Sequence, residues 1–394
     1  MAFGLDYLFN LAAGRMLPPA EFGIVVSLAG VGQILVVASR VVQTVVTRTV
    51  SRFQSQTHGN RLVAAFFQQA YRSAGGWGSG ITAVFILLSW PLAKFLQIED
   101  VRPALALAVT TILMALRPVV GGVLQGQQRF EPLGLIQIIQ AGGRLLLAVG
   151  LMAVGYGAFG AMAALPVGSL MALLFGLWVL RDLRRSRVDE SPVSDLPELM
   201  RYSAFTAAGL IGFALLINMD AILVKRFFDP DAAGNYATAV TLGKVIQFFP
   251  VAIIMILFPK AARRRAENRD TRAVLLPALA VVGVLCGLVA LLYFLIPDLL
   301  IQLIFGDAYQ LPPRVLGLSG LAMMLLSLAN VWLNYFLSTE RTRFVYLVWA
   351  AIFIQFATMS VWHDALWQLP IAMIVSGFWL TAAGTAVYLI RGQW

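Results

Sequence analysis

Long apolar runs recur along this chain, and they limit it to folds that a lipid bilayer can hold. One of them reads "VVGVLCGLVALLYFLI" over residues 281–296. A helix of about 20 such residues crosses roughly 30 Å of hydrocarbon at a rise of 1.5 Å per residue. The composition agrees, because 60% of the 394 residues are hydrophobic, only 12% are charged, and the mean hydropathy is +0.82. We therefore predict an all-α polytopic membrane protein.

About twelve transmembrane helices are predicted from these runs. The first apolar stretch is short, since only about fourteen residues precede Arg15 and a helix of that length cannot cross a bilayer unaided. We therefore expect this helix to be truncated at its beginning. The twelve predicted spans are residues 1–15, 22–47, 74–97, 103–126, 132–154, 157–180, 202–225, 235–258, 273–297, 315–338, 343–362 and 366–390.

Lysine and arginine are distributed unevenly between the loops. Most lie in even-numbered loops and near the C-terminus, as in "RDLRRSR" at residues 181–187 and "RRR" at residues 263–265. Odd-numbered loops hold only Arg15, Lys94, Arg102, Lys225, Arg226 and Arg314. Because cytoplasmic loops carry the excess of positive charge, we predict that the even-numbered loops and both termini are cytoplasmic.

The chain also repeats itself. The segments "GRMLPPAEFGIVVS" (14–27) and "KRFFDPDAAGNYAT" (225–238) align without a gap at an offset of 211 residues. The two copies follow the first and the seventh predicted spans, and because six is an even number both halves start across the membrane in the same direction. We expect two parallel six-helix repeats around a central cavity. The predicted parts are an N-terminal lobe at 1–180, a cytoplasmic linker at 181–201 and a C-terminal lobe at 202–394.

Five cations fall inside or at the edge of the apolar runs: Arg40, Arg72, Arg117, Arg144 and Lys244. Such a residue near the bilayer centre costs at least about 2.5 kcal/mol, so it normally faces a watery cavity, a partner or an anionic ligand. We expect Arg72 to reach the cytoplasmic interface. Arg117 either covers carbonyl groups freed by Pro118 or lines the cavity. Arg40, Arg144 and Lys244 either bind phosphate or acidic sugars in the cavity or form ion pairs between helices.

Two acids, Asp6 and Asp220, also lie inside apolar runs. Asp220 is five and six residues before Lys225 and Arg226, whereas good helical neighbours are three or four residues apart. Its partner must therefore come from another helix. Three roles stay open for Asp220: a partly solvated structural position near the outer helix end, an ion pair between the lobes, or binding of a coupling ion. Asp6 has the same functional alternatives.

The residues that catalysis or metal binding would need are sparse. The chain has one cysteine, Cys286, and two histidines, His58 and His363, without the spacing of a metal site or of a nucleophile and base. No glycine-rich phosphate loop ends in GK[ST], so we expect no ATP bound to this chain. The basic residues follow membrane topology rather than a nucleic-acid-binding face. We predict no catalytic residue, no metal, no cofactor and no nucleic-acid partner.

Several motifs resemble those of one family of transporters. They are "AGRMLPPAEFG" after the first span, "TVVTRTVSRF" at the end of the second, "GGVLQGQQRF" at the end of the fourth, "NMDAILVKRFFDPDAAGNYATA" and "LIQLIFGDAYQ". In these residues the chain resembles Wzx-type polysaccharide flippases of the multidrug/oligosaccharidyl-lipid/polysaccharide exporter superfamily. The resemblance covers essentially the whole chain.

This resemblance implies a membrane protein that is not an enzyme and that moves its substrate by alternating access. The implied substrate is an oligosaccharide joined through pyrophosphate to a polyprenol, and the implied place is the bacterial cytoplasmic (inner) membrane. Membrane lipids, a polysaccharide polymerase and other assembly proteins are the partners it implies. Two alternatives stay open: an ion-coupled multidrug or small-molecule antiporter of the same superfamily, and a membrane polysaccharide polymerase or ligase. A drug antiporter would favour an acidic cavity, whereas this chain has more intramembrane cations than acids.

Overall fold

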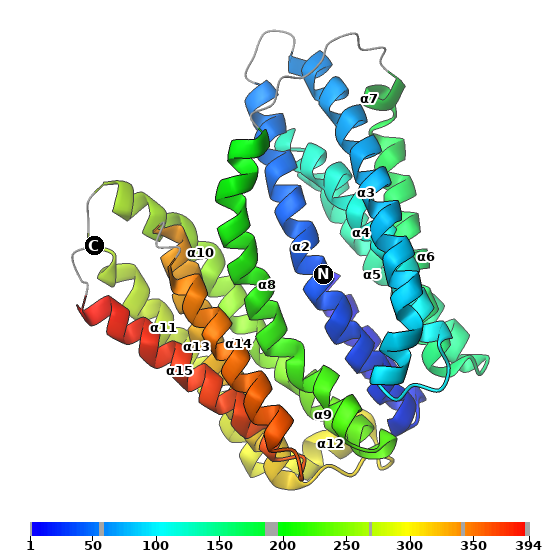
Figure 1. The fold of residues 1–394 in the computed structure, drawn as a ribbon, viewed down its shortest axis with the longest axis vertical. Coiled ribbons are helices and arrows are strands. Elements are labelled where there is room, and N and C mark those ends of the chain that lie inside the picture. The colour runs from blue at the N-terminus through cyan, green and yellow to red at the C-terminus, as the bar shows by residue number, and fades with distance from the viewer. Residues whose placement is uncertain (1, 55–58, 186–195, 268–269, 340–342, 391–394) are drawn as a thin grey trace. The chain divides into compact units, whose positions relative to one another are not determined.

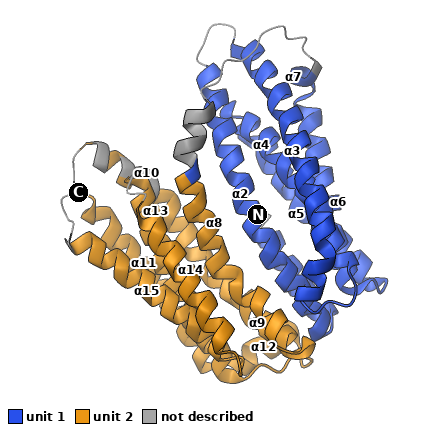
Figure 2. Cartoon of the chain, in the orientation of Figure 1, with its two compact units in different colours: residues 1–204 blue, residues 205–394 orange. Residues whose placement is uncertain are grey.

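The computed structural model describes residues 2–54, 59–185, 196–267, 270–339 and 343–390, and these form helices joined by short connections, with no strand among them (Figure 1). The predicted all-α class is confirmed. The chain divides into two compact units, residues 1–204 and 205–394 (Figure 2). Part of the predicted linker at 181–201 lies outside the described residues, and the helices α7 (Arg181–Arg185) and α8 (Leu196–Phe227) reach into its two ends.

Eleven segments of the described chain are helical and long and apolar enough to cross a membrane, with α9 and α10 counted together as one, against twelve predicted spans. The difference is the first span, which is α1 (Ala2–Met16) and has 15 residues. At 1.5 Å per residue it measures about 22 Å, which is less than the hydrocarbon core. The prediction that this helix is too short to cross unaided agrees with its observed length.

Unit 1 is organised around α4 (Arg102–Gly126), which packs on α2 (Pro19–Gln54), α3 (Gly59–Phe95) and α6 (Gly157–Val179). The helix α5 (Phe130–Ala153) packs on α6 and on α1. α3 begins well before the predicted start at residue 74. The amphipathic stretch 61–74 continues the helix on its apolar face, where Val63, Phe66 and Phe67 are buried.

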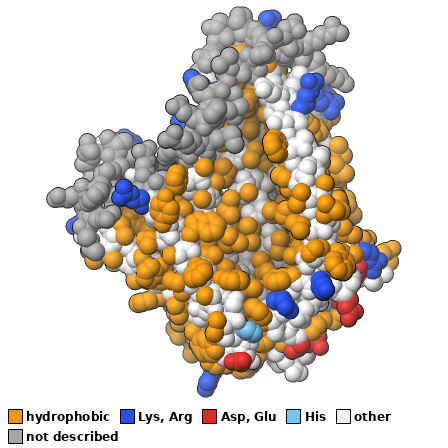
Figure 3. Space-filling view, viewed as in Figure 1, with side chains coloured by type: hydrophobic (Ala, Val, Ile, Leu, Met, Phe, Trp, Pro, Cys, Tyr) orange, Lys and Arg blue, Asp and Glu red, His pale blue; other side chains and the backbone are white. Residues whose placement is uncertain are grey.

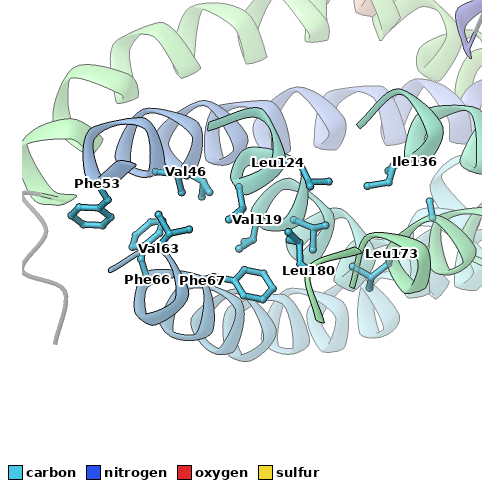
Figure 4. Close-up of a cluster of buried hydrophobic side chains, with 14 of the residues drawn as sticks. Val46, Phe53, Val63, Phe66, Phe67, Val119, Leu124, Ile136, Leu173 and Leu180 are labelled. Carbon is cyan, nitrogen blue, oxygen red and sulfur yellow. The ribbon is translucent and has the colours of Figure 1, made fainter. Parts of the chain in front are cut away.

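A cluster of buried apolar side chains closes one end of unit 1. Phe53 of α2 and Phe66 of α3 meet edge to face at 5.8 Å between ring centroids. Figure 4 shows how Val119 and Leu124 of α4 and Leu180 after α6 complete this cluster. Three helices and the chain that follows α6 are thereby fixed against one another at this end.

Unit 2 repeats this pattern of packing around α13 (Pro313–Ser338). α13 contacts α9 (Pro230–Ile246), α10 (Phe248–Ala266), α11 (Arg272–Leu295) and α15 (Gln368–Ile390), and α15 packs on α14 (Phe344–Val361). The buried Gln355 of α14 donates its amide N–H to the Leu216 carbonyl of α8 at 2.9 Å. Gln355 lies 211 residues after Arg144 of α5, and this distance equals the offset of the sequence repeat, so α14 occupies in unit 2 the place that α5 occupies in unit 1. The prediction of two parallel six-helix repeats is confirmed.

The predicted span 235–258 is broken into two helices, α9 and α10, at Gln247. Pro250 lacks the N–H that would bond to the Ile246 carbonyl, and its ring crowds that carbonyl, so a continuous helix is disfavoured. The Cys286 thiol of α11 donates to the freed Ile246 oxygen, with 3.6 Å between sulfur and oxygen. The predicted outer loop at 298–314 is also partly helical, because it contains α12 (Pro297–Phe305).

Large apolar side chains are exposed on the outer faces of the helices, as contact with lipid requires. Leu87 of α3 and Leu146 of α5 are each 76% exposed, and Phe353 of α14 is 73% exposed. Hydrophobic side chains cover the middle of each unit on the face seen in Figure 3, and charged side chains gather near the ends. At one such end, Arg102 donates from Nε to both Asp100 oxygens at 2.9 Å, and these hydrogen bonds hold the pKa of Asp100 below its ordinary value.

Candidate functional site

An ion pair joins two helices inside unit 1. Arg144 Nη1 of α5 lies 3.4 Å from Asp6 Oδ1 of α1. The Arg144 side chain is 15% exposed and that of Asp6 is 51% exposed. Arg144 is nine residues from the end of α5 at Ala153, or about 14 Å, and Asp6 is ten residues, or about 15 Å, from the end of α1 at Met16. Both charges therefore lie more than two helical turns from these helix ends.

Phe9 and Arg117 complete this group. The Arg144 guanidinium carbon lies 3.6 Å from the centroid of the buried Phe9 ring, so the cation stacks on an aromatic face. Arg117 of α4 acts electrostatically on Asp6 as well. The Nε atoms of Arg117 and Arg144 are buried and have no hydrogen-bond partner among the described residues. We call Asp6, Arg117 and Arg144 the cationic cluster.

The charges of the cationic cluster do not balance. Two guanidinium groups face one carboxylate, and a buried cation that lacks a partner is costly in a membrane. An anion with several oxygen atoms would satisfy the two remaining N–H groups, because guanidinium binds phosphate and carboxylate through paired hydrogen bonds. The arrangement is therefore suited to an anionic ligand.

A second polar group lies in unit 2. Asp220 of α8 is 1% exposed, and its Oδ2 accepts a hydrogen bond from the hydroxyl of Tyr236 of α9 at 3.1 Å. Lys244 of α9 acts electrostatically on the same carboxylate. The partly solvated interpretation of Asp220 is wrong, because α8 continues to Phe227 and the side chain is buried against α9. Its hydrogen-bond partner does come from another helix, as the residue spacing predicts.

The structure thus brings together Asp6, Arg117 and Arg144 in unit 1 and Asp220 and Lys244 in unit 2. Arg40 belongs to neither group: it is exposed on α2, and its guanidinium has no partner among the described residues. Whether these residues bind substrate or a coupling ion stays a prediction. In the part of the chain that the structure describes, no group of three or more His, Cys, Asp or Glu residues is placed to hold a metal ion.

The sequence alone did not indicate a role for three residues near these charged groups, which are Phe9, Tyr236 and Lys225. Phe9 is three residues after Asp6 and so shares its helical face, which is a usable signal. Tyr236 lies in the second copy of the repeated turn, but nothing in the sequence links it to Asp220. Lys225 is predicted to lie in a loop, yet it lies in the last turn of α8 and is only 1% exposed.

Similarity to known proteins is found both in the sequence and in the fold. The profile of a family described as "Polysaccharide biosynthesis protein" matches residues 12–313. A comparison with curated proteins gives no match.

Solved structures share the fold over nearly the whole chain. One described as "Inward-facing conformation of a multidrug resistance MATE family transporter of the MOP superfamily" is 12% identical, with a TM-score of 0.82 over 98% of this chain and 96% of that one. One described as an outward-facing conformation of such a transporter is 14% identical, with a TM-score of 0.63 over 99% and 92%. A MATE in complex with MaD3S is 15% identical, with a TM-score of 0.64 over 99% and 93%. The fold is that of membrane transporters.

Proposed function

The chain belongs to the polysaccharide biosynthesis protein family that matches residues 12–313, and from this premise we propose that it is a flippase for a lipid-linked oligosaccharide. The substrate is an oligosaccharide joined through pyrophosphate to a polyprenol, carried from the cytoplasmic to the outer leaflet by alternating access. The family and the fold are those of membrane transporters, not of catalytic enzymes. The proposed place is the bacterial cytoplasmic membrane, with both termini cytoplasmic, and the proposed partners are a polysaccharide polymerase and other assembly proteins.

The cationic cluster is the observation that supports this proposal most directly. A flippase for such a substrate has to carry a pyrophosphate past the middle of the bilayer while the lipid tail stays in the hydrocarbon. Arg117 and Arg144 supply two guanidinium groups with buried Nε atoms inside apolar helices, and Arg144 is paired with the Asp6 carboxylate. In this proposal the pyrophosphate takes the two Nε–H groups that protein atoms leave unused. Arg40 and Lys244 are candidates for further contacts along the path.

A second candidate function is an ion-coupled antiporter for small cationic molecules. The buried Asp220, held by Tyr236 and shielded from lipid, is the kind of carboxylate that a coupling ion or a cationic substrate would use. The two functions make opposite demands. A flippase depends on the arginines of the cationic cluster, whereas a cation antiporter depends on the acids.

Lipid analysis of cells that lack the protein, complemented with variants, separates the two functions. R117Q/R144Q removes two charge-assisted contacts, each worth at least about 1.5 kcal/mol, so substrate binding is expected to weaken by about 100-fold. We expect polyprenyl-pyrophosphate oligosaccharide to accumulate and the polymer to be lost, with normal amounts of the variant in the membrane. The matched control is R102Q, which removes an exposed arginine at the end of α4 and should leave export unchanged.

Full export by R117Q/R144Q would overturn the cationic cluster as the phosphate site. An unchanged lipid pool in cells without the protein, together with altered tolerance to cationic drugs, would favour the antiporter. R144K provides a further check. Lysine keeps the charge but loses the fork of N–H donors, so partial export by R144K alongside none by R144Q would indicate bidentate phosphate binding.

A further inference from the structure

Two neighbouring pockets open at one end of unit 1, away from the cationic cluster. The first, of about 350 Å³, lies between the start of α3, the α4–α5 turn and α7. The second, of about 580 Å³, lies between the last turns of α6 and α7. Both volumes fall in or near the range of small-ligand sites. Asp182 lines both pockets, so they share a wall.

Each pocket contains two arginines. Arg61 and Arg129 line the first, and neither guanidinium makes an ion pair or hydrogen bond with another described residue. Arg181 and Arg184 line the second, where Arg181 Nε lies 3.8 Å from Asp182 Oδ1 and the Arg181 guanidinium carbon lies 5.6 Å from the ring centroid of Trp178. Among the described residues, four cations and one carboxylate therefore line the paired pockets, and this balance favours an anionic ligand.

The α4–α5 turn places its polar groups by backbone geometry. Gln128 has a φ of +59°, in the left-handed region, and the Arg129 N–H donates back to the Leu124 carbonyl at 2.9 Å. Gln127, beside it in the first pocket, has a buried amide oxygen without a hydrogen-bond partner among the described residues. Turning the amide by 180° would present its two N–H donors instead, which suits an oxyanion in the pocket.

The segments beneath the pockets are held in place by a hydrogen bond and by apolar packing, and apolar surface lies beside the second pocket. Gln68 of α3 donates to the Leu183 carbonyl at 3.0 Å and so holds α7, while Leu180 and Leu183 pack on the apolar cluster of Figure 4. The second pocket is bordered by Leu174 and Trp178, which are 57% and 61% exposed. A ligand here would have polar groups at the arginines and an apolar part along α6.

We propose that these two pockets bind the headgroup of a membrane phospholipid with two phosphates, of the cardiolipin type. Each pocket takes one phosphate on its pair of arginines. The carboxylate of Asp182, between the pockets, accepts a hydrogen bond from the hydroxyl of the glycerol that links the two phosphates. The acyl chains lie along Leu174 and Trp178. By the distribution of Lys and Arg this end of unit 1 is the cytoplasmic one, where basic pockets between helices meet anionic headgroups.

The proposal is tested by native mass spectrometry of the purified full chain with cardiolipin, phosphatidylglycerol or phosphatidylethanolamine added at equal concentration. We expect one bound cardiolipin in preference to the other two lipids. Each arginine near a headgroup contributes about fivefold in affinity, so R61Q/R129Q and R181Q/R184Q should each weaken cardiolipin binding by about 25-fold. The control R48Q/R263Q removes two exposed arginines outside the pockets and should bind as the unchanged protein does.

Two further measurements identify the ligand chemistry. Cardiolipin without its central hydroxyl should bind the unchanged protein a few-fold more weakly than cardiolipin does, and D182A should abolish this difference. Inorganic pyrophosphate at a concentration equal to that of cardiolipin should not displace it. Displacement by pyrophosphate, equal binding of all three lipids, or equal weakening by R48Q/R263Q would each overturn the proposal. Thermal unfolding of every variant in detergent confirms that it is folded.

Discussion

Arg144 and Asp6 illustrate how a membrane protein accommodates charge in its apolar interior. The carboxylate on α1 and the Phe9 ring on the same helix both face the guanidinium of α5. A charge inside an apolar run is rare enough to be found in the sequence, and that signal selected both residues. Their pairing could not be predicted in the same way, because 138 residues separate them and only the packing of α1 on α5 brings them together.

The hydrogen bond between Tyr236 and Asp220 should contribute measurably to stability. Y236F removes the donor and leaves the buried carboxylate with less support, so we expect the free energy of unfolding to fall by about 1 kcal/mol, as for other interhelical hydrogen bonds in membranes. Thermal unfolding in detergent measures this. Y346F makes the same chemical change at a hydroxyl on an exposed side chain and should be neutral. Equal effects of the two changes would show that Tyr236 does not hold Asp220.

At the scale of helices, hydropathy predicts which segments cross the membrane but not how far each helix continues. The apolar runs locate the eleven long spans, since burial in lipid needs only apolar side chains. α3 extends beyond its run because one face of its polar part is covered by α2 and α4. Hydropathy does not predict the break between α9 and α10, because the break depends on the hydrogen bond that Pro250 cannot donate to the Ile246 carbonyl.

Close packing of α2 on α4 depends on glycines spaced four residues apart. A Cβ added at Gly122 would lie 2.7 Å from the Val46 side chain and 2.8 Å from the Gln43 backbone oxygen, and one at Gly126 would lie 2.7 Å from Val50. Such small residues let two helices approach closely in a membrane. Their sequence signature is the "GGVLQG" stretch at 121–126.

Alanine substitutions at two glycines are expected to change the free energy of unfolding in opposite directions. G122A should destabilise the protein by about 1–3 kcal/mol, because the new methyl group meets backbone that cannot move aside. G150A is the matched control on α5, where a Cβ would meet nothing within 4 Å. There the better helix propensity of alanine should stabilise the protein by up to about 1 kcal/mol. Melting temperatures that shift in the same direction for both variants would contradict the close α2–α4 contact.

For the whole molecule, the sequence repeat predicts the two similar halves, whereas the loop charges predict which side of the membrane each loop faces. The repeated turn at 14–27 and 225–238 predicted two similar halves, and the matching contacts of α4 and α13 confirm them. The sidedness of the chain comes from Lys and Arg alone, because no contact within a helical unit depends on which end faces the cytoplasm. Some of those cations, such as Arg187, Arg341 and Arg391, lie outside the described residues.

Labelling of single introduced cysteines tests this sidedness. Val154 is exposed at the outer end of the predicted span 132–154, Asp307 is exposed in a predicted outer loop, and Gln54 and Asp270 are exposed in predicted cytoplasmic loops. In intact cells a membrane-impermeant maleimide should label V154C and D307C, whereas Q54C and D270C should react only after the cells are opened. The native Cys286 is buried and donates to the Ile246 carbonyl, so the unchanged protein is the unlabelled control. The reverse pattern would place the arginine-lined pockets of unit 1 outside the cell and remove the cytoplasmic leaflet from the proposed lipid contact.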